Sequence, residues 1–170
     1  MDKAVWVDDG SWMAGGTTMM LRRFQLNLDV WDTLTRERQE KVVGRTLATG
    51  APLTGVAERD VMDLAAKDSD GQYVIAANAH ARLAHPDSNS GRRMLRRGLN
   101  YVYDEDGRRT SGLMFIAFVR SIAGQLTPVL QRLDQTDALN EWTTPIGSSI
   151  WAFPGGYPTD GWLAKGLFAS

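Results

Sequence analysis

The sequence predicts an α+β domain with a largely antiparallel sheet. Strand-like segments outnumber helical ones and occur in mixed order with them, which is typical of this fold class. The chain has 170 residues, enough for one domain with a sizeable core. We therefore expect residues 1–170 to form a single domain.

The first half of the chain contains a β-prone piece, an alternating run and a capped helix. Val5–Val7 is a short strand candidate. The run Thr17–Val30 mixes basic residues with an alternation of apolar and polar residues at 25–30, and we predict a long strand there. Thr35 can cap a helix over about 36–47. Residues 50–72 mix glycine, proline and charge, which predicts a long loop, and such loops are usually functional or insertions.

The rest of the chain is expected to hold four more strands and one helix. Short apolar and β-branched runs predict strands at 73–75, 94–103, 113–119 and 149–153. A helix should cover about Ile122–Leu133, where Pro128 limits or kinks it. Residues 85–92 are expected to be loop.

Composition excludes several classes of function. The 19 basic and 20 acidic side chains leave a net charge of −1, so no global field attracts nucleic acid or lipid. The chain has no cysteine, which excludes disulfides, thiolate catalysis, zinc–thiolate sites and thiolate-ligated haem. No run approaches the roughly 20 apolar residues of a membrane span, so we expect a soluble protein. The cellular compartment stays open.

The segment from Ala79 to Tyr101 carries the strongest chemical candidates. It contains both histidines of the chain, His80 and His85, and Arg96 follows His80 by sixteen residues. A neutral imidazole suits an iron centre, and a fixed guanidinium suits an anion or a peroxide. Arg97, the next residue of a predicted strand, should point to the opposite face. A structural histidine and a solvated arginine-rich surface remain the alternatives at this point.

Other common catalytic motifs do not occur. The chain has no His-x-His, HExxH or Gly-x-Ser-x-Gly sequence, and its glycine pairs match neither a P-loop nor a dinucleotide fingerprint. Hydrolase and nucleotide-binding functions are therefore weakly supported.

Several segments, including AHARLAHP at 79–86 and RMLRRGLNY at 93–101, together resemble one known family. The matching segments are residues 6–7 with 12–16, then 21–32, 37–53, 79–86, 93–101, 112–118 and 139–155. In this order they resemble the C-terminal half of dye-decolourising (DyP-type) peroxidases, haem enzymes built from two ferredoxin-like halves. The resemblance implies a ferredoxin-like domain of the dimeric α+β barrel type.

The resemblance also implies roles for individual residues. His80 resembles the proximal ligand to the iron of haem b, with one haem per chain, and Arg96 resembles the distal catalytic arginine. His85, Pro86 and Asp87 correspond to a stretch that lines the haem. The other ring nitrogen of His80 should bond a carboxylate or carbonyl, but the sequence does not name that partner.

One family motif is missing. The distal aspartate of these enzymes lies in a Gly-x-x-Asp-Gly motif, and none of the four Asp-Gly pairs here has glycine three residues before the aspartate. We expect this chain to be the C-terminal half, with the distal-aspartate half absent. A fragment or split gene product is favoured over a natural truncation.

The resemblance therefore implies a haem-dependent peroxidase that uses hydrogen peroxide to oxidise dyes or other one-electron donors. Two alternatives remain: a non-catalytic haem-binding module or remnant, and a structural protein without a cofactor. The expected partners are peroxide, a reducing substrate, and either the N-terminal half or a second copy of the chain. That second chain would cover an apolar sheet face that an isolated half exposes. We expect no nucleic acid and no membrane span.

Overall fold

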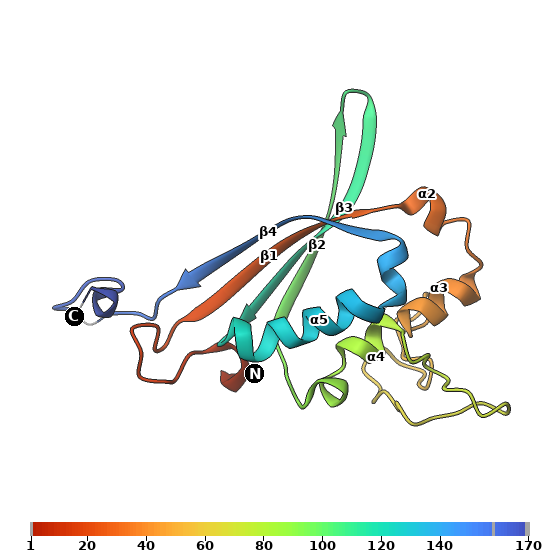
Figure 1. Ribbon diagram of the computed structural model, residues 1–170, viewed down its shortest axis with the longest axis horizontal. Helices are drawn as coiled ribbons and strands as arrows, with labels where there is room; N and C mark the ends of the chain where they lie inside the picture. The colour runs from red at the N-terminus through yellow and green to blue at the C-terminus, as the bar shows by residue number, and fades with distance from the viewer. Residues whose placement is uncertain (1, 158, 169–170) are drawn as a thin grey trace. The chain divides into compact units, whose positions relative to one another are not determined.

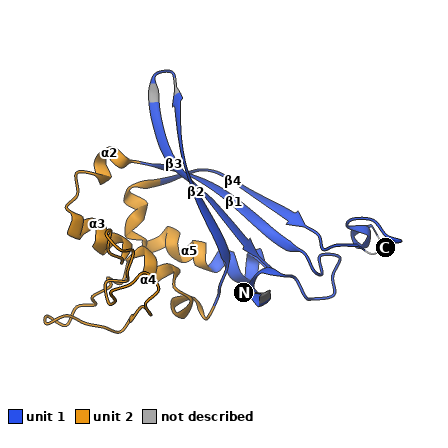
Figure 2. Ribbon diagram, turned by 180° about the vertical axis from the view of Figure 1, so that it is seen from behind, with its two compact units in different colours: residues 1–26, 92–128, 144–170 blue, residues 27–91, 129–143 orange. Residues whose placement is uncertain are grey.

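A computed structural model describes residues 2–157 and 159–168 of the chain. They fold into two compact units, drawn in different colours in Figure 2. The first unit comprises residues 1–26, 92–128 and 144–170, and the second comprises 27–91 and 129–143. Residues 1, 158 and 169–170 of the expected domain lie outside the described residues. The assignment of 1–170 to a single domain stays a prediction.

A four-stranded antiparallel sheet dominates the first unit and confirms the predicted α+β class. Its strands are β1 (Thr17–Leu26), β2 (Leu95–Glu105), β3 (Arg108–Val119) and β4 (Thr143–Phe153), in the order β2-β3-β1-β4 (Figure 1). β3 pairs antiparallel with both β1 and β2. Thr18 lies opposite Val119, and Leu95 lies opposite Phe118.

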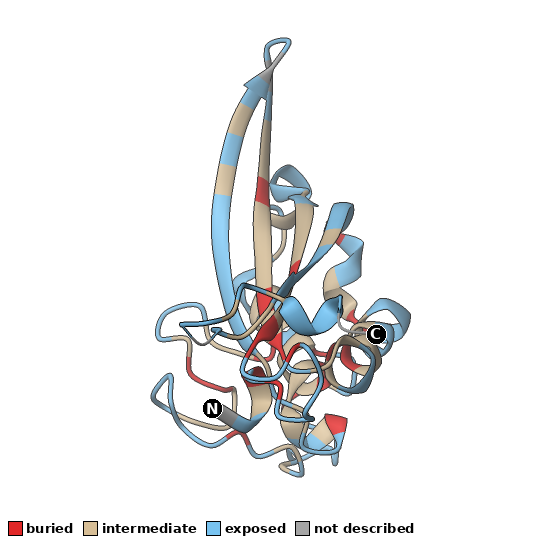
Figure 3. Ribbon diagram, turned by 90° about the vertical axis from the view of Figure 1, so that its left-hand side faces the viewer, coloured by how far each residue is buried: buried red, intermediate tan, exposed pale blue. Residues whose placement is uncertain are grey.

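The two faces of the sheet carry different residues. Ala117 of β3 is fully buried, and its partner Met20 on β1 is nearly so; Figure 3 shows how burial varies along the strands. Arg96 lies opposite Ala117, whereas Arg97 lies opposite Ile116. The two arginines therefore lie on opposite faces, as expected from the alternation of side chains along a strand.

The N-terminal segment differs from its sequence-based prediction. Residues Asp2–Val5 form a short helix, α1, and Val7 is in no strand. Instead, the Val7 N–H donates to the Gly16 carbonyl and the Gly15 N–H donates to the Val7 carbonyl. The predicted strand at Val5–Val7 is wrong, because these backbone groups close a local loop.

β1 begins at Thr17 as predicted but ends at Leu26 instead of Val30. A single helical turn, α2 (Leu28–Trp31), takes up the remaining residues. The Trp31 N–H donates to the Asn27 carbonyl, so this backbone bonds within its own turn and not to a strand.

Helix α3 (Arg36–Val43) starts where the sequence predicts and ends earlier. The Thr35 side chain accepts a hydrogen bond from the Arg38 N–H at 3.3 Å, which is the expected N-cap. Gly44 then adopts a left-handed conformation with φ of 85°, and its N–H caps the Glu40 carbonyl. A glycine in this position is a common helix stop, so the helix ends before residue 47.

The expected long loop is present, but the strand predicted at Tyr73–Ile75 does not form. Tyr73 makes only an isolated bridge with Lys67. Ile75 is fully buried against Met62 and Ala79. Its apolar side chain therefore packs into a small core and does not belong to a sheet. A short helix, α4 (His80–Ala84), and a 3-10 turn, η1 (Pro86–Asn89), follow.

The predicted helix at Ile122–Leu133 consists of two pieces. A π-helical turn, η2 (Ile122–Leu126), leads into α5 (Thr127–Thr136). Pro128, which has no N–H to donate to the preceding turn, lies where the two pieces meet. Two 3-10 turns complete the elements, η3 (Ala138–Glu141) and η4 (Lys165–Leu167). No helix in the described part of the chain is both long and apolar enough to cross a membrane.

Gly112 of β3 allows a close approach that another residue would prevent. A Cβ atom there would lie 2.2 Å from the Phe24 carbonyl oxygen and 2.2 Å from the Tyr101 ring. We expect Gly112→Ala to lower the free energy of unfolding by about 1–3 kcal/mol, the usual cost of overpacking. Urea unfolding measures this, with Gly147→Ala as the matched control, because a Cβ at Gly147 of β4 meets nothing within 4 Å. Equal losses in both variants would contradict the expectation.

Candidate functional site

His80 begins helix α4 in the second unit. The residue before it, Ala79, is fully buried and has extended backbone dihedral angles, so the chain turns into the helix at His80. The His80 side chain is about one-third exposed (34%). Its ring is thus partly accessible while its backbone is anchored in the core of the second unit.

Asp137 binds the His80 ring. Its Oδ2 lies 2.6 Å from Nδ1 of His80, and its side chain is only 3% exposed. A buried carboxylate can only accept hydrogen bonds, so Nδ1 carries the proton and Nε2 keeps its lone pair in the neutral ring. No hydrogen bond or ion pair to Nε2 occurs among the described residues. In its neutral form the ring therefore has a lone pair on Nε2 that no described residue uses.

The backbone around Asp137 holds this carboxylate in place. Oδ1 of Asp137 accepts the Leu139 N–H at 2.9 Å and so caps η3, while Oδ2 binds His80. The neighbouring Ala138 N–H donates to the Asn78 carbonyl at 3.0 Å. The segment that carries Asp137 is therefore tied directly to the segment that leads into His80.

The small residues beside His80 serve helix packing. Ala79 and Ala81 flank His80 on either side. In the structure both lie against Gly44: a Cβ at Gly44 would be 3.3 Å from the Ala79 Cβ and 3.4 Å from the Ala81 Cβ. The end of α3 thus packs tightly against the start of α4, which fixes the orientation of His80.

Arg82 of α4 anchors the long loop. Its guanidinium donates to the Ile75 carbonyl at 2.9 Å and to the Leu64 carbonyl at 2.7 Å. It also lies over the Tyr73 ring, 4.6 Å from the centroid. These contacts hold residues 64–75 against the helix that carries His80.

The predicted lining residues His85, Pro86 and Asp87 directly follow α4. Nδ1 of His85 accepts the Asp87 N–H at 3.2 Å, so in the neutral ring the proton is on Nε2. The buried Asn89 amide donates to the Leu83 and His85 carbonyls at 2.7 and 2.8 Å. His85 thus caps its own turn, whereas the ring of His80 is oriented by a carboxylate.

Arg96, the predicted distal residue, lies on β2 in the first unit. Its side chain is exposed and makes no hydrogen bond or ion pair with any described residue. Its guanidinium is therefore a permanent charge that no carboxylate of the described residues neutralises.

The sequence did not single out Asp137. The only local signal is an aspartate placed before a short turn, which predicts a cap and not a histidine partner. No three histidine, cysteine or acidic side chains come together as a metal site within the described residues. A metal bound here would take most of its ligands from elsewhere.

The fold and the comparisons place the chain in a known class. Its antiparallel α+β architecture is the ferredoxin-like class of its structural neighbours. The chain belongs to the DyP-type peroxidases: the family model described as "Dyp-type peroxidase, C-terminal" matches residues 1–157.

Individual relatives agree with this assignment. The chain is 42% identical to a dye-decolorizing peroxidase of Thermobifida fusca over 147 residues, covering 85% of this chain and 34% of the relative. It is 35% identical over 164 residues to a deferrochelatase of Escherichia coli (strain K12), covering 91% of this chain and 38% of that protein.

Solved structures give the same result. A DyP-type peroxidase from Cellulomonas bogoriensis matches with a TM-score of 0.90 and 45% identity, covering 99% of this chain and 47% of that one. An oxyferrous complex of DtpA from Streptomyces lividans matches with a TM-score of 0.89 and 35% identity, again covering 99% and 47%. The chain spans less than half the length of each of these relatives.

Proposed function

We propose that this chain is the proximal-ligand half of a haem-dependent peroxidase of the DyP type, which uses hydrogen peroxide to oxidise dyes or other one-electron donors. The observation that carries the proposal is the pair formed by His80 and the buried Asp137. An imidazole that donates its Nδ1 proton to a carboxylate is held in one tautomer and donates more strongly through Nε2. Haem iron is held by such a histidine in globins and peroxidases.

The donor set fits haem b, with one group per chain, better than a bare metal ion. His80 offers one nitrogen, and the described residues supply no cluster of three ligands around it. Haem brings four nitrogen ligands of its own, so a single histidine is enough. When bound, haem would supply the iron at which peroxide is reduced and an organic donor is oxidised.

Each of the other predicted residues has a role in this proposal. Arg96 is exposed and has no carboxylate partner among the described residues. It would offer a fixed positive charge to peroxide and to the negative charge that develops on its oxygens. His85, Pro86 and Asp87 would line the haem. The aspartate of the Gly-x-x-Asp-Gly motif, which would move a proton, would come from an N-terminal half.

Apolar residues exposed on one face of the sheet support the proposal that an N-terminal half packs against it. Leu95 and Leu99 alternate along the β2 face that carries Arg97, and both are exposed. Phe153 of β4 is exposed too, and its ring lies 6.4 Å from the ring of Phe118. Contiguous apolar surface of this kind typically marks an interface. We propose that the N-terminal half of the enzyme, or else a second copy of the chain, covers it.

A haem-binding module without turnover is the second candidate function. Residues 1–170 contain no Gly-x-x-Asp-Gly motif, so these residues alone would bind haem without supplying the family's distal acid. The same experiment separates the two functions.

The experiment is a haem titration of the purified chain, followed by a peroxide assay. We expect a saturable Soret band at one haem per chain. Peroxide-dependent dye oxidation should then exceed that of free haem only when the N-terminal portion of the Thermobifida fusca relative is added as a separate chain. Absence of a Soret band would overturn haem binding. A Soret band with no turnover in either mixture would favour the non-catalytic module.

A further inference from the structure

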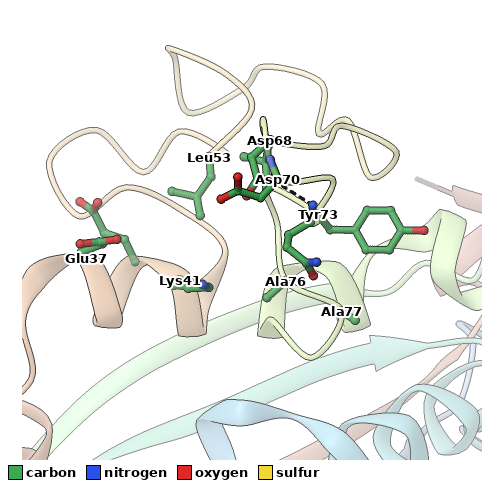
Figure 4. Close-up of a pocket in the computed structure, with 11 residues that line it drawn as sticks. Glu37, Lys41, Leu53, Asp68, Asp70, Tyr73, Ala76 and Ala77 are labelled. Atoms are coloured by element: carbon green, nitrogen blue, oxygen red, sulfur yellow. Dashed lines mark hydrogen bonds between the residues drawn. The ribbon is translucent and has the colours of Figure 1, made fainter.

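A cavity of about 560 Å³ lies in the second unit, between α3 and the loop that leads to His80. Glu37, Glu40 and Lys41 of α3 form one wall, and Asp68 and Asp70 lie on the facing loop (Figure 4). Its volume falls within the usual range for small-molecule sites, about 300–1,000 Å³. The cavity is therefore large enough for an organic ligand.

The walls carry an excess of negative charge. Four carboxylates line the cavity, and Lys41 is the single cation among its lining residues. Glu40 is partly neutralised by Arg36 at 3.0 Å, whereas Glu37 and Asp70 have no ion-pair partner among the described residues. The Leu47 N–H and then Arg36 lower the pKa of the Glu40 carboxyl, so this group stays ionised in mild acid. The cavity should thus attract cations.

Apolar groups of the lining make the cavity suitable for an organic cation. Leu53, Val74, Ala76 and Ala77 contribute aliphatic surface. Leu53 and Ala76 also pack against the buried cluster around Ile75, so this surface rests on a fixed core. The Tyr73 ring points away from the cavity in Figure 4 and already has Lys67 and Arg82 over it. The ring of a bound ligand would therefore pack against the aliphatic side chains of the lining and not against Tyr73.

The arrangement of the carboxylates suits a cation whose charge is spread over many atoms better than it suits a metal ion. No three acidic or histidine side chains come together as a metal site in the part of the chain that the structure describes. A divalent ion needs several oxygens at about 2.0–2.6 Å from one point. A planar organic cation spreads its charge over many atoms and can use carboxylates on separate walls.

We propose that this cavity binds a planar organic cation, held by Glu37 and Asp70 on opposite walls and by the aliphatic surface between them. Ala76 and Ala77 lie just before Asn78, whose carbonyl binds the segment of Asp137, so the ligand would rest on the loop that leads to His80. That this cation is the reducing substrate rests on the proposed function, whereas the binding itself does not.

Equilibrium dialysis of the haem-free chain with methylene blue, a planar aromatic cation, tests the proposal. Exposed ion pairs contribute about 0.2–1 kcal/mol each, so Glu37→Gln and Asp70→Asn should each raise the dissociation constant about 1.4–5-fold. Lys41→Gln should lower it by a similar factor because it removes the one opposing charge. Asp32→Asn, which removes an exposed carboxylate outside the cavity, should leave it unchanged.

Glu37→Gln should raise the dissociation constant and Lys41→Gln should lower it. Damage to the fold would weaken binding in both variants, so the opposite changes distinguish binding in the cavity from unfolding. The proposal is overturned if the Glu37→Gln/Asp70→Asn double variant binds methylene blue like the parent chain, or if Lys41→Gln binds no more tightly. It is also overturned if fluorescein, an anion of similar size, binds equally well, or if Mn²⁺ binds stoichiometrically and displaces the dye. Because no haem is present, failure of haem binding would leave this result unaffected.

Discussion

His80→Ala is expected to abolish specific haem binding. The substitution removes the imidazole that Asp137 orients through a hydrogen bond of 2.6 Å, and with it the proposed ligand atom Nε2. Loss of a residue that merely supports a metal ligand typically costs about 10–100-fold in metal affinity. Loss of the ligand itself should therefore raise the haem dissociation constant by more than about 100-fold. A Soret titration of the purified variant measures the change.

His85→Ala is the matched control, because His85 is the only other histidine and lies five residues away. Its ring caps a turn, so we expect less than a tenfold change in haem affinity. A His80→Gly variant should regain its Soret band when imidazole is added, which shows that the variant still folds. If His85→Ala loses the band and His80→Ala keeps it, the ligand assignment moves to His85.

The strands of the sheet could be predicted because their signal is local. The apolar run at 113–119 lies within β3, whereas the alternation at 25–30 falls mostly beyond the end of β1 at Leu26. The Thr35 cap was predicted for the same reason, since it acts over three residues. Such features need only neighbouring residues, so the fold class could be inferred from the sequence.

Errors arose where tertiary contacts override local preference. Tyr73–Ile75 has strand-forming residues, but Ile75 is buried in a small core and its carbonyl binds Arg82. Gly44 ended α3 early, although the apolar pattern continues to Leu47. The first outcome depends on a packing partner distant in the sequence, whereas the second follows from a local glycine stop that the apolar pattern does not register.

The candidate site was only partly predictable for the same reason. His80 and Arg96 stand out by residue type and by resemblance to the family. Asp137 lies 57 residues after His80 and has no motif of its own, so only the fold brings its carboxylate within 2.6 Å of Nδ1. The roles of His80 and Arg96 stay proposals, whereas the contact between His80 and Asp137 is a feature of the structure.

Asp137→Asn should weaken haem binding about 10–100-fold and raise the reduction potential of the bound iron. Asparagine keeps the shape of aspartate and can still cap η3 through its carbonyl oxygen, because both residues are good N-caps. It removes the negative charge that strengthens electron donation by His80, and a less strongly donating histidine stabilises the ferric state less. Spectroelectrochemical titration gives the potential, and Soret titration gives the affinity.

Comparing Asp137→Ala with Asp137→Asn separates the effect of the negative charge from the effect of the helix cap. Asp137→Ala removes both, so it should also lower the free energy of unfolding by about 0.5–2 kcal/mol through the lost cap, whereas Asp137→Asn should change stability less. A purely structural Asp137 would shift stability in both variants and leave the potential of any bound haem unchanged. An unaltered potential in Asp137→Asn, together with parental haem affinity, would therefore show that the carboxylate does not act through His80.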